Sequence, residues 1–329
     1  MRNRYLVALR ISAALTLVAI LLWVTYMPGT SFDGSPTPVD AALQKRLTNH
    51  IAKLSNEIGA RSVTVYPSLI AAEKYLTDHW TTAGFKVERM PYTLTDGHEV
   101  ANLEVLIPGT DNTKTFVIGA HYDSVQTCPG ANDNATGAAA VLELASNAKQ
   151  SNPPINLRFV LFVNEEPPYF QKKEQGSAVY VRAAAQRAEK IVGMLSIETI
   201  GYFSDAAGSQ SYPFPFSLLY PSMGNFIGFV GNMRSGSFVR KTIGAFRNHG
   251  QIPSEGVAAP AAIPGIGWSD HGRFWDIGAP ALMITDTAPF RYPHYHQQSD
   301  TMDKLDMEQM TRVVSGLDAA LPELLTELR

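Results

Sequence analysis

The sequence predicts an α/β fold, a single domain with a central mixed, mostly parallel β-sheet flanked by helices. Short apolar runs alternate with longer helical patterns along most of the 329 residues. Hydrophobic residues make up 45% of the chain and charged residues 17%, which allows a sizeable core and excludes a disordered polyelectrolyte. Polar clusters directly follow several apolar runs, as expected at the carboxyl edge of a parallel sheet.

Residues 1–27 are predicted to form an N-terminal signal anchor or transmembrane helix. Arg2, Arg4 and Arg10 precede an uncharged run that ends at Met27. Counted from Leu6 the apolar stretch has 22 residues, which span about 33 Å of helix against a hydrocarbon core of ~30 Å. The positive flank predicts that the rest lies outside the cytoplasm, periplasmic or extracellular. A cleaved signal peptide, which would leave a secreted protein, is the alternative.

Residues 28–40 are predicted to be a linker, and residues 41–329 a single domain. Apolar spacing predicts helices over 39–58 and 68–83 and strands over 103–107 and 115–120. Further elements follow in order: a helix over 138–149, a strand over 157–163, a helix over 177–188, strands over 194–200 and 281–285, and an amphipathic helix over 307–328.

The aromatic-rich segment 202–267 has two interpretations. It either forms peripheral helices with aromatic core residues, or it covers the domain and shapes an apolar specificity pocket. The first is the simpler expectation from the residue types alone.

Five polar clusters lie just past five predicted strands. They are His121–Ser124, Ala131–Gly137, Asn164–Glu166, Glu198, and Tyr292–His296 with Asp300 and Thr301. Imidazole and carboxylate groups without thiolates are typical of catalytic sites for zinc or a similar divalent ion. The single cysteine, Cys128, excludes a thiolate zinc module and a disulfide scaffold.

Each cluster also has a structural alternative. His121 could simply bond to Asp123, and Asp133 could cap the following helix. Glu165 and Glu166 could form a solvated turn, although two acids after a fully apolar strand are unusual. An unpaired carboxylate at Glu198, on the edge of an apolar run, would be costly to bury. The joint placement of the clusters therefore favours a metal site, while spacing alone does not choose between His294 and His296.

In this order, the clusters resemble the motifs of the co-catalytic di-zinc metallopeptidases typified by bacterial secreted leucyl aminopeptidases, peptidase family 28. That family also includes glutamate carboxypeptidases and glutaminyl cyclases. The matching motifs are Gly119–Ser124, Gly130–Gly137, Asn164–Glu166, Glu198–Gly201, Ser269–His271 and Tyr295–Thr301. They cover roughly residues 40–329, and the resemblance implies the zinc-exopeptidase-like fold.

The resemblance also implies roles for individual residues. Two zinc ions would be bridged by Asp133, the first held also by His121 and Glu198, and the second also by Glu166 and His296. Glu165 would be the general base and Asp123 would orient His121. The family often has aspartate where this chain has Glu198, so the geometry of that ligand stays open. The resemblance assigns no role to Ser269–His271.

The function implied is zinc-dependent hydrolysis of peptide bonds with a metal-activated water. An aminopeptidase that removes N-terminal, apolar residues from peptide substrates is the leading expectation. A glutaminyl-cyclase-like acyltransferase and a non-catalytic receptor-like ectodomain are the alternatives, and the choice between amino and carboxyl ends stays open. The net charge of −3 argues against a nucleic-acid partner. The chain also lacks a Gly-x-Ser-x-Gly elbow and a His-Glu-x-x-His helix.

Overall fold

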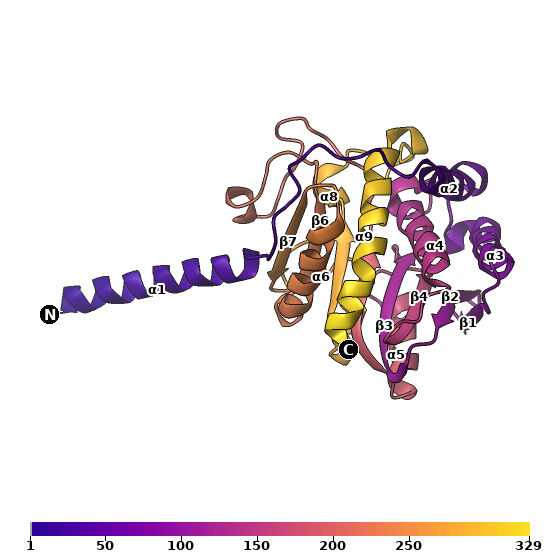
Figure 1. Cartoon of the computed structure of the whole chain (residues 1–329), viewed down its shortest axis with the longest axis horizontal. Coiled ribbons are helices and arrows are strands. Elements are labelled where there is room, and N and C mark those ends of the chain that lie inside the picture. Colours follow the sequence, from indigo (N-terminus) through magenta and orange to yellow (C-terminus); the bar gives the residue numbers. More distant parts are fainter. Residues whose placement is uncertain (1) are drawn as a thin grey trace.

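The computed structural model describes residues 2–329, without the side chains of residues 2–4, 6–9, 13, 14, 17, 18 and 21. Within this range the chain forms an eight-stranded sheet of order β1-β2-β4-β3-β5-β8-β6-β7 (Figure 1). The strands are β1 Glu88–Thr93, β2 Glu99–Ile107, β3 Asp111–His121, β4 Ile155–Phe162, β5 Lys190–Ile197, β6 Ile227–Asn232, β7 Ser254–Ala259 and β8 Ala281–Thr285.

The sheet has a parallel centre. Strands β4, β3, β5 and β8 pair in parallel, and so do β6 and β7. The pairs β1–β2, β2–β4 and β6–β8 are antiparallel. The predicted α/β class with a mixed sheet is therefore confirmed, and the carboxyl ends of β4, β3, β5 and β8 meet at one edge.

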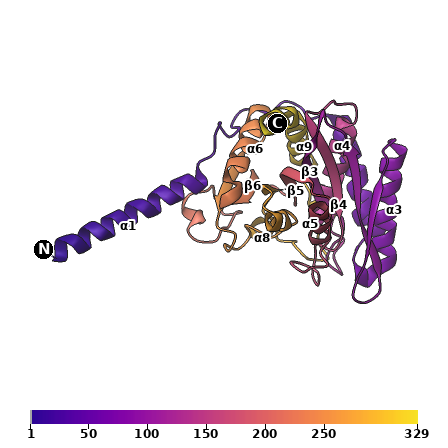
Figure 2. The ribbon, with the colours of Figure 1, turned by 90° about the horizontal axis from the view of Figure 1, so that it is seen from below.

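Helices cover both faces of the sheet (Figure 2). The helices are α2 Ala41–Ile51, α3 Tyr66–Thr82, α4 Gly137–Ala148, α5 Gly176–Gln186, α6 Gly236–His249, α7 His271–Phe274, α8 Ala288–Arg291 and α9 Met307–Leu328. Alternate residues of β3 point to opposite faces: Phe116 and Ile118 join the core under α4, α6 and α9. Val117 packs with Tyr180 of α5 and Phe274 of α7. Both faces of the central strands are thus buried.

Helix α1 (Arg2–Thr25) projects away from the domain (Figure 1). In the described part of the chain, no helix meets the length and apolarity that a membrane crossing requires. The predicted transmembrane helix at residues 1–27 is therefore not supported by the structure, although part of that prediction falls on Met1 and on side chains outside the described residues. Arg240 donates to the carbonyl of Trp23 at 2.6 Å and so holds the end of α1 against α6.

Two other predicted elements differ in the structure. The helix expected over 39–58 is α2, capped by Asp40, followed by a π-helical stretch, η1 (Ala52–Ile58). Segment 202–267 is not made only of peripheral helices, because β6 and β7 from it join the sheet around α6. Both strands contain glycine, which lowers the intrinsic preference for a strand. The strands of this segment were therefore not predicted from its composition.

Candidate active site

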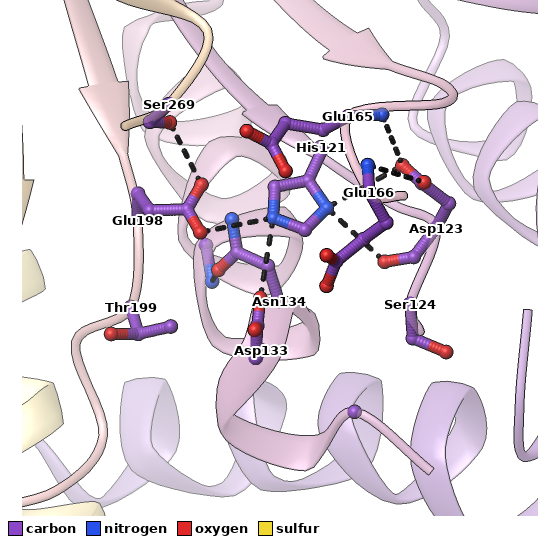
Figure 3. Close-up of polar contacts among 12 residues, drawn as sticks. His121, Asp123, Ser124, Asp133, Asn134, Glu165, Glu166, Glu198, Thr199 and Ser269 are labelled. Carbon is purple, nitrogen blue, oxygen red and sulfur yellow. Dashed lines mark hydrogen bonds and ion pairs between the residues drawn. The ribbon is translucent and has the colours of Figure 1, made fainter. Parts of the chain in front are cut away.

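His121 is the last residue of β3 and is fully buried. Its Nε2 lies 3.1 Å from Oε1 of Glu198 and 3.3 Å from Oδ1 of Asp133. Its Nδ1 lies 3.2 Å from the backbone oxygen of Asp123 and 3.4 Å from its Oδ1. Figure 3 shows His121, Glu166 and Glu198 directed into one space between the strand ends. The side chains after β3, β4 and β5 thus meet.

Asp133 occupies the centre of this cluster. It lies on a kinked turn before α4, η3 (Ala131–Thr136), with a cis peptide bond to Asn134. Asp300 holds the turn by accepting the backbone N–H groups of Asn132 and Asp133 at 2.8 and 3.1 Å. Asp133 Oδ1 faces His121, and Oδ2 lies 3.1 Å from Nε2 of His296. One carboxylate is therefore shared between two histidines.

Glu166 and His296 complete the second half of the cluster. Oε2 of Glu166 lies 3.3 Å from Nε2 of His296. The backbone N–H groups of Glu165 and Glu166 donate to the Asp123 carboxylate at 3.1 and 3.2 Å, which orients the end of β4. His294 instead lies 2.8 Å from Oγ of Ser299 through its Nδ1. Of the two candidate histidines, the structure brings His296 into the cluster.

The donor set fits two divalent cations. Two groups, His121–Asp133–Glu198 and Asp133–Glu166–His296, each place three ligand atoms within 4.8 Å of one another. Among the described residues, both oxygens of Asp133, Oε1 of Glu166 and Nε2 of His296 are buried without a hydrogen bond of regular geometry, although Asp133 lies within ion-pair distance of both histidines. Buried polar atoms are normally paired. Convergent unpaired ligand atoms of N and O type are what a zinc-like ion would satisfy.

The electrostatics of the cluster lead to the same conclusion. Burial raises the pKa of Glu166 to about 8, and the Asp133 carboxylate adds to the rise. Burial also raises the pKa of Glu165 well above its ordinary value, with Glu198 adding to the effect. Several carboxylates packed this closely need positive charge among them to stay ionised. Two dications would supply that charge.

Comparison with known proteins identifies the family. The family model for Peptidase family M28 matches residues 102–320. The chain belongs to peptidase family M28. It is 35% identical over 304 residues to the uncharacterized protein YfbL of Escherichia coli, covering 90% of each chain. It is 28% identical over 219 residues to a probable leucine aminopeptidase of Arthroderma otae, covering 62% of this chain and 51% of that protein.

Solved structures share the fold. The zinc aminopeptidase BSAP of Bacillus subtilis superimposes with a TM-score of 0.68 at 13% identity, covering 85% of this chain and 95% of BSAP. A glutaminyl cyclase of Fimbriiglobus ruber gives a TM-score of 0.60 at 21% identity, covering 90% and 99%. At these identities the likeness concerns the fold.

An apolar pocket adjoins the cluster of this M28 peptidase. Its space is about 850 Å³, including the open mouth, and Glu198 and Thr199 line it on the side of the cluster. Its walls are largely aromatic and come mostly from segment 202–267 and the loop after β8: Tyr212, Phe216, Tyr220, Phe226, Trp268 and Phe290. Residues of segment 202–267 therefore line an apolar pocket, and a role of the segment in specificity stays a prediction.

Asp286 is a supporting residue of this M28 site that sequence reasoning missed. Its carboxylate accepts from the Asn132 side chain at 2.9 Å, from Oγ1 of Thr199 at 2.5 Å and from the backbone N–H of Tyr202 at 2.8 Å. It thereby joins the turn that carries Asp133 to the chain after β5. Asp286 directly follows β8, so the rule that polar groups gather past strand ends could have found it.

Arg61 is a second missed residue, and it is fully buried. Its guanidinium donates to five backbone carbonyls, those of Leu54, Gly59, Tyr122, Pro129 and Gly130, at 2.6 to 3.0 Å. Burial lowers the pKa of Arg61 to about 10, so it stays protonated at neutral pH. Through these hydrogen bonds Arg61 connects the chain after His121 and the loop before Asp133 to η1. No local sequence pattern marks such a role.

Ser269 gives a direct test of how Glu198 is held. Its Oγ donates to Oε2 of Glu198 at 2.8 Å and lies 2.9 Å from Oγ of Ser196. Replacing a residue that orients a metal ligand typically costs about 10–100-fold in metal affinity or activity. We expect Ser269→Ala to weaken zinc affinity within that range, measured by competition with a chromogenic chelator. Ser146→Ala, at a half-buried position of α4 where the hydroxyl donates to the Leu142 carbonyl, is the matched control, and equal affinities in both variants would contradict the role.

Proposed function

We propose that this M28 peptidase is a di-zinc aminopeptidase that removes N-terminal residues whose side chains fit an apolar pocket beside the metal site. The observation that carries the proposal is the pair of three-residue ligand groups that share Asp133. Zinc bound there would act as a Lewis acid on the scissile carbonyl and lower the pKa of water. The residues His121, Asp133, Glu166, Glu198 and His296 would hold it.

Glu165 is the residue that moves the proton. Its buried carboxyl lies beside the ligand groups and forms a third convergent set with His121 and Glu166. A carboxylate oxygen of Glu165 accepts a proton from the attacking water and returns it to the nitrogen of the leaving amine. Asp123 keeps Glu165 in place through the backbone N–H of that residue and keeps the His121 ring oriented. No serine or cysteine nucleophile is needed.

Two further observations support the proposal. The named relatives include a probable leucine aminopeptidase, and a zinc aminopeptidase shares the fold. The aromatic pocket beside Glu198 suits the apolar part of the side chain on the residue that is removed. The glutaminyl cyclase neighbour shows that the fold also accommodates a different reaction, which the following experiment separates.

We expect the purified protein to bind about two zinc ions per chain and to hydrolyse aminoacyl chromogenic substrates. Chelation should abolish turnover and added zinc should restore it, because the ligand groups would lose and regain the cations that pair their charges. Metal analysis by mass spectrometry and a substrate panel test both. An inert protein with both zinc ions bound would contradict the proposal. If the protein binds one zinc ion and cyclises a peptide with an N-terminal glutamine, the glutaminyl-cyclase alternative is favoured. If it does not bind zinc, the non-catalytic ectodomain is favoured.

We also propose that the domain acts outside the cytoplasm, anchored to the membrane by residues 1–27 or secreted after their removal. The proposal rests on Arg2, Arg4 and Arg10 before the apolar run. Fractionation of a bacterial host that expresses the full chain with a C-terminal tag tests it. Protease added to spheroplasts should digest an anchored domain, and a secreted domain should leave with the periplasmic fraction. Protection from protease together with the cytoplasmic fraction would contradict it.

A further inference from the structure

A carboxylate lies in the apolar pocket away from the metal ligands. Glu255 belongs to the edge strand β7 and lines the pocket with the aromatic residues. Within the described part of the chain, its carboxylate has no hydrogen-bond or ion-pair partner. The nearby tyrosine hydroxyls donate elsewhere, Tyr212 to the carbonyl of Pro221 at 2.7 Å and Tyr220 to the carbonyl of Gly256 at 2.6 Å. Glu255 therefore faces the pocket without a donor.

Arg247 on α6 is the cation that acts on Glu255, but its hydrogen bonds are directed elsewhere. Its Nη2 and Nε donate to the backbone oxygen and Oγ of Ser254 at 2.7 and 3.1 Å. Its Nη1 donates to the carbonyls of Pro28 and Gly29 at 3.0 and 3.2 Å. Burial raises the pKa of Glu255. The positive charge of Arg247 opposes this rise, but only by Coulombic attraction without a hydrogen bond. A carboxylate left like this in an apolar pocket costs free energy that a cation from a ligand would offset.

The sheet register places Glu255 in line with the metal end of the pocket. Glu198 follows Ile197, which pairs with Ile284 of β8. The next residue of β8, Thr285, pairs with Gly228, and Gly228 pairs with Glu255. The row crosses three strand spacings, about 14 Å at ~4.8 Å each. Glu198 and Glu255 thus lie near opposite ends of one pocket.

Gly228 keeps the middle of this row open. A Cβ at that position would lie 3.2 Å from the backbone oxygen of Thr285 and 3.5 Å from Cγ2 of Thr287, so any larger side chain would extend into the pocket. Gly228 lines the pocket between Thr285 and Glu255 and places no side chain there.

We propose that Glu255 selects substrates whose N-terminal residue carries a long, positively charged side chain, lysine or arginine. The proposal rests on the aminopeptidase function and names its preferred substrate class. The aromatic walls contact the methylene stem and offer cation–π attraction to its charged end. Glu255 accepts a charge-assisted hydrogen bond from the ammonium or guanidinium group. Apolar residues of similar length fill the same pocket without that bond and are the poorer substrates.

Lysyl- and norleucyl-p-nitroanilide test this preference, because their side chains share a four-carbon stem and differ in the ammonium group. We expect the wild type to have the higher kcat/KM for lysine. Glu255→Gln should lower the lysine-to-norleucine ratio of kcat/KM at least 10-fold, and Glu255→Leu should lower it further. Glu88→Gln removes an exposed carboxylate on β1, at the other edge of the sheet, and should keep the wild-type ratio. An unchanged ratio in both Glu255 variants would overturn the proposal while leaving the peptidase function intact.

A binding measurement keeps the test independent of turnover. In the Glu165→Gln background, calorimetry should show tighter binding of lysinamide than of norleucinamide. Adding Glu255→Gln should lower the ratio of the two affinities at least 10-fold. If no aminoacyl substrate is hydrolysed while this dependence on Glu255 holds, the aminopeptidase function fails and the basic-ligand site stands. If lysinamide binding does not depend on Glu255, the inference fails whatever the turnover.

Discussion

Glu165→Gln is expected to lower kcat about 10²–10⁴-fold, the range that a positioned general acid–base supplies. Glutamine keeps the shape of glutamate but cannot accept the proton of the attacking water. The backbone N–H of residue 165 still donates to Asp123, so the end of β4 stays in place. KM should change much less than kcat, because the loss falls on the transition state.

Two controls separate this effect from damage to the metal centre. Zinc content and the thermal midpoint of Glu165→Gln should match those of the wild type, because Glu165 lies outside the two groups that share Asp133. Asp133→Asn should behave differently and lose zinc, because both ligand groups depend on that carboxylate. If Glu165→Gln retains more than a tenth of wild-type kcat, another group is the base. If it loses zinc instead, Glu165 is a ligand.

Arg61→Met is expected to have the largest effect on stability, a loss of roughly 3–5 kcal/mol in the free energy of unfolding. Methionine keeps an apolar stem of similar length but leaves five carbonyl oxygens without their donor, three in buried and two in part-buried hydrogen bonds. Two of these, on Pro129 and Gly130, belong to the loop before Asp133, so zinc affinity should fall with stability. Urea unfolding and zinc titration measure the two effects.

Arg61→Lys and Arg182→Met complete the experiment. Lysine keeps the charge but offers three donors at one point in place of a planar fork, so its loss should be intermediate. Arg182 is exposed on α5, and replacing it should change stability by less than about 0.5 kcal/mol. Equal stability of Arg61→Met and wild type would show that the carbonyls find other donors and that Arg61 does not hold the loop.

The parts of the fold that the sequence predicted well are those whose pattern is local. The strand Ala281–Thr285 and the helix Met307–Leu328 match their predicted bounds. A strand buried on both faces is a short apolar run, and an amphipathic helix repeats at a helical period. Strand β1 was not predicted because its side chains are mostly exposed and polar at the sheet edge. Strands β6 and β7 were missed because glycine weakens the strand signal.

The candidate metal ligands could be predicted from the sequence, whereas the residues that support them could not. His121, Glu166 and Glu198 follow apolar runs, so topology alone brings them to one edge, and the structure places them together. Arg61 lies in an irregular stretch, and three of its five acceptors are 61 to 69 residues away in the chain. Glu255 is one acid in a short strand, and its place in the pocket depends on the register of three neighbouring strands. Such roles arise from tertiary contacts, which a single sequence does not display.

The candidate catalytic residues and the pocket residues lie mostly on different halves of the sheet, which has a consequence for how the substrate preference could change. Most of the groups proposed to transfer the proton and to hold cations follow β3, β4 and β5, and His296 follows β8, whereas the pocket walls and Glu255 come mostly from β6, β7 and the segment around them. Strand β8 lies between the two halves and contacts both. Substitutions in the half that contains β6 and β7 should change which peptides are cleaved without moving the candidate catalytic residues. The catalytic reaction and the substrate preference can therefore change independently, although both depend on the same sheet.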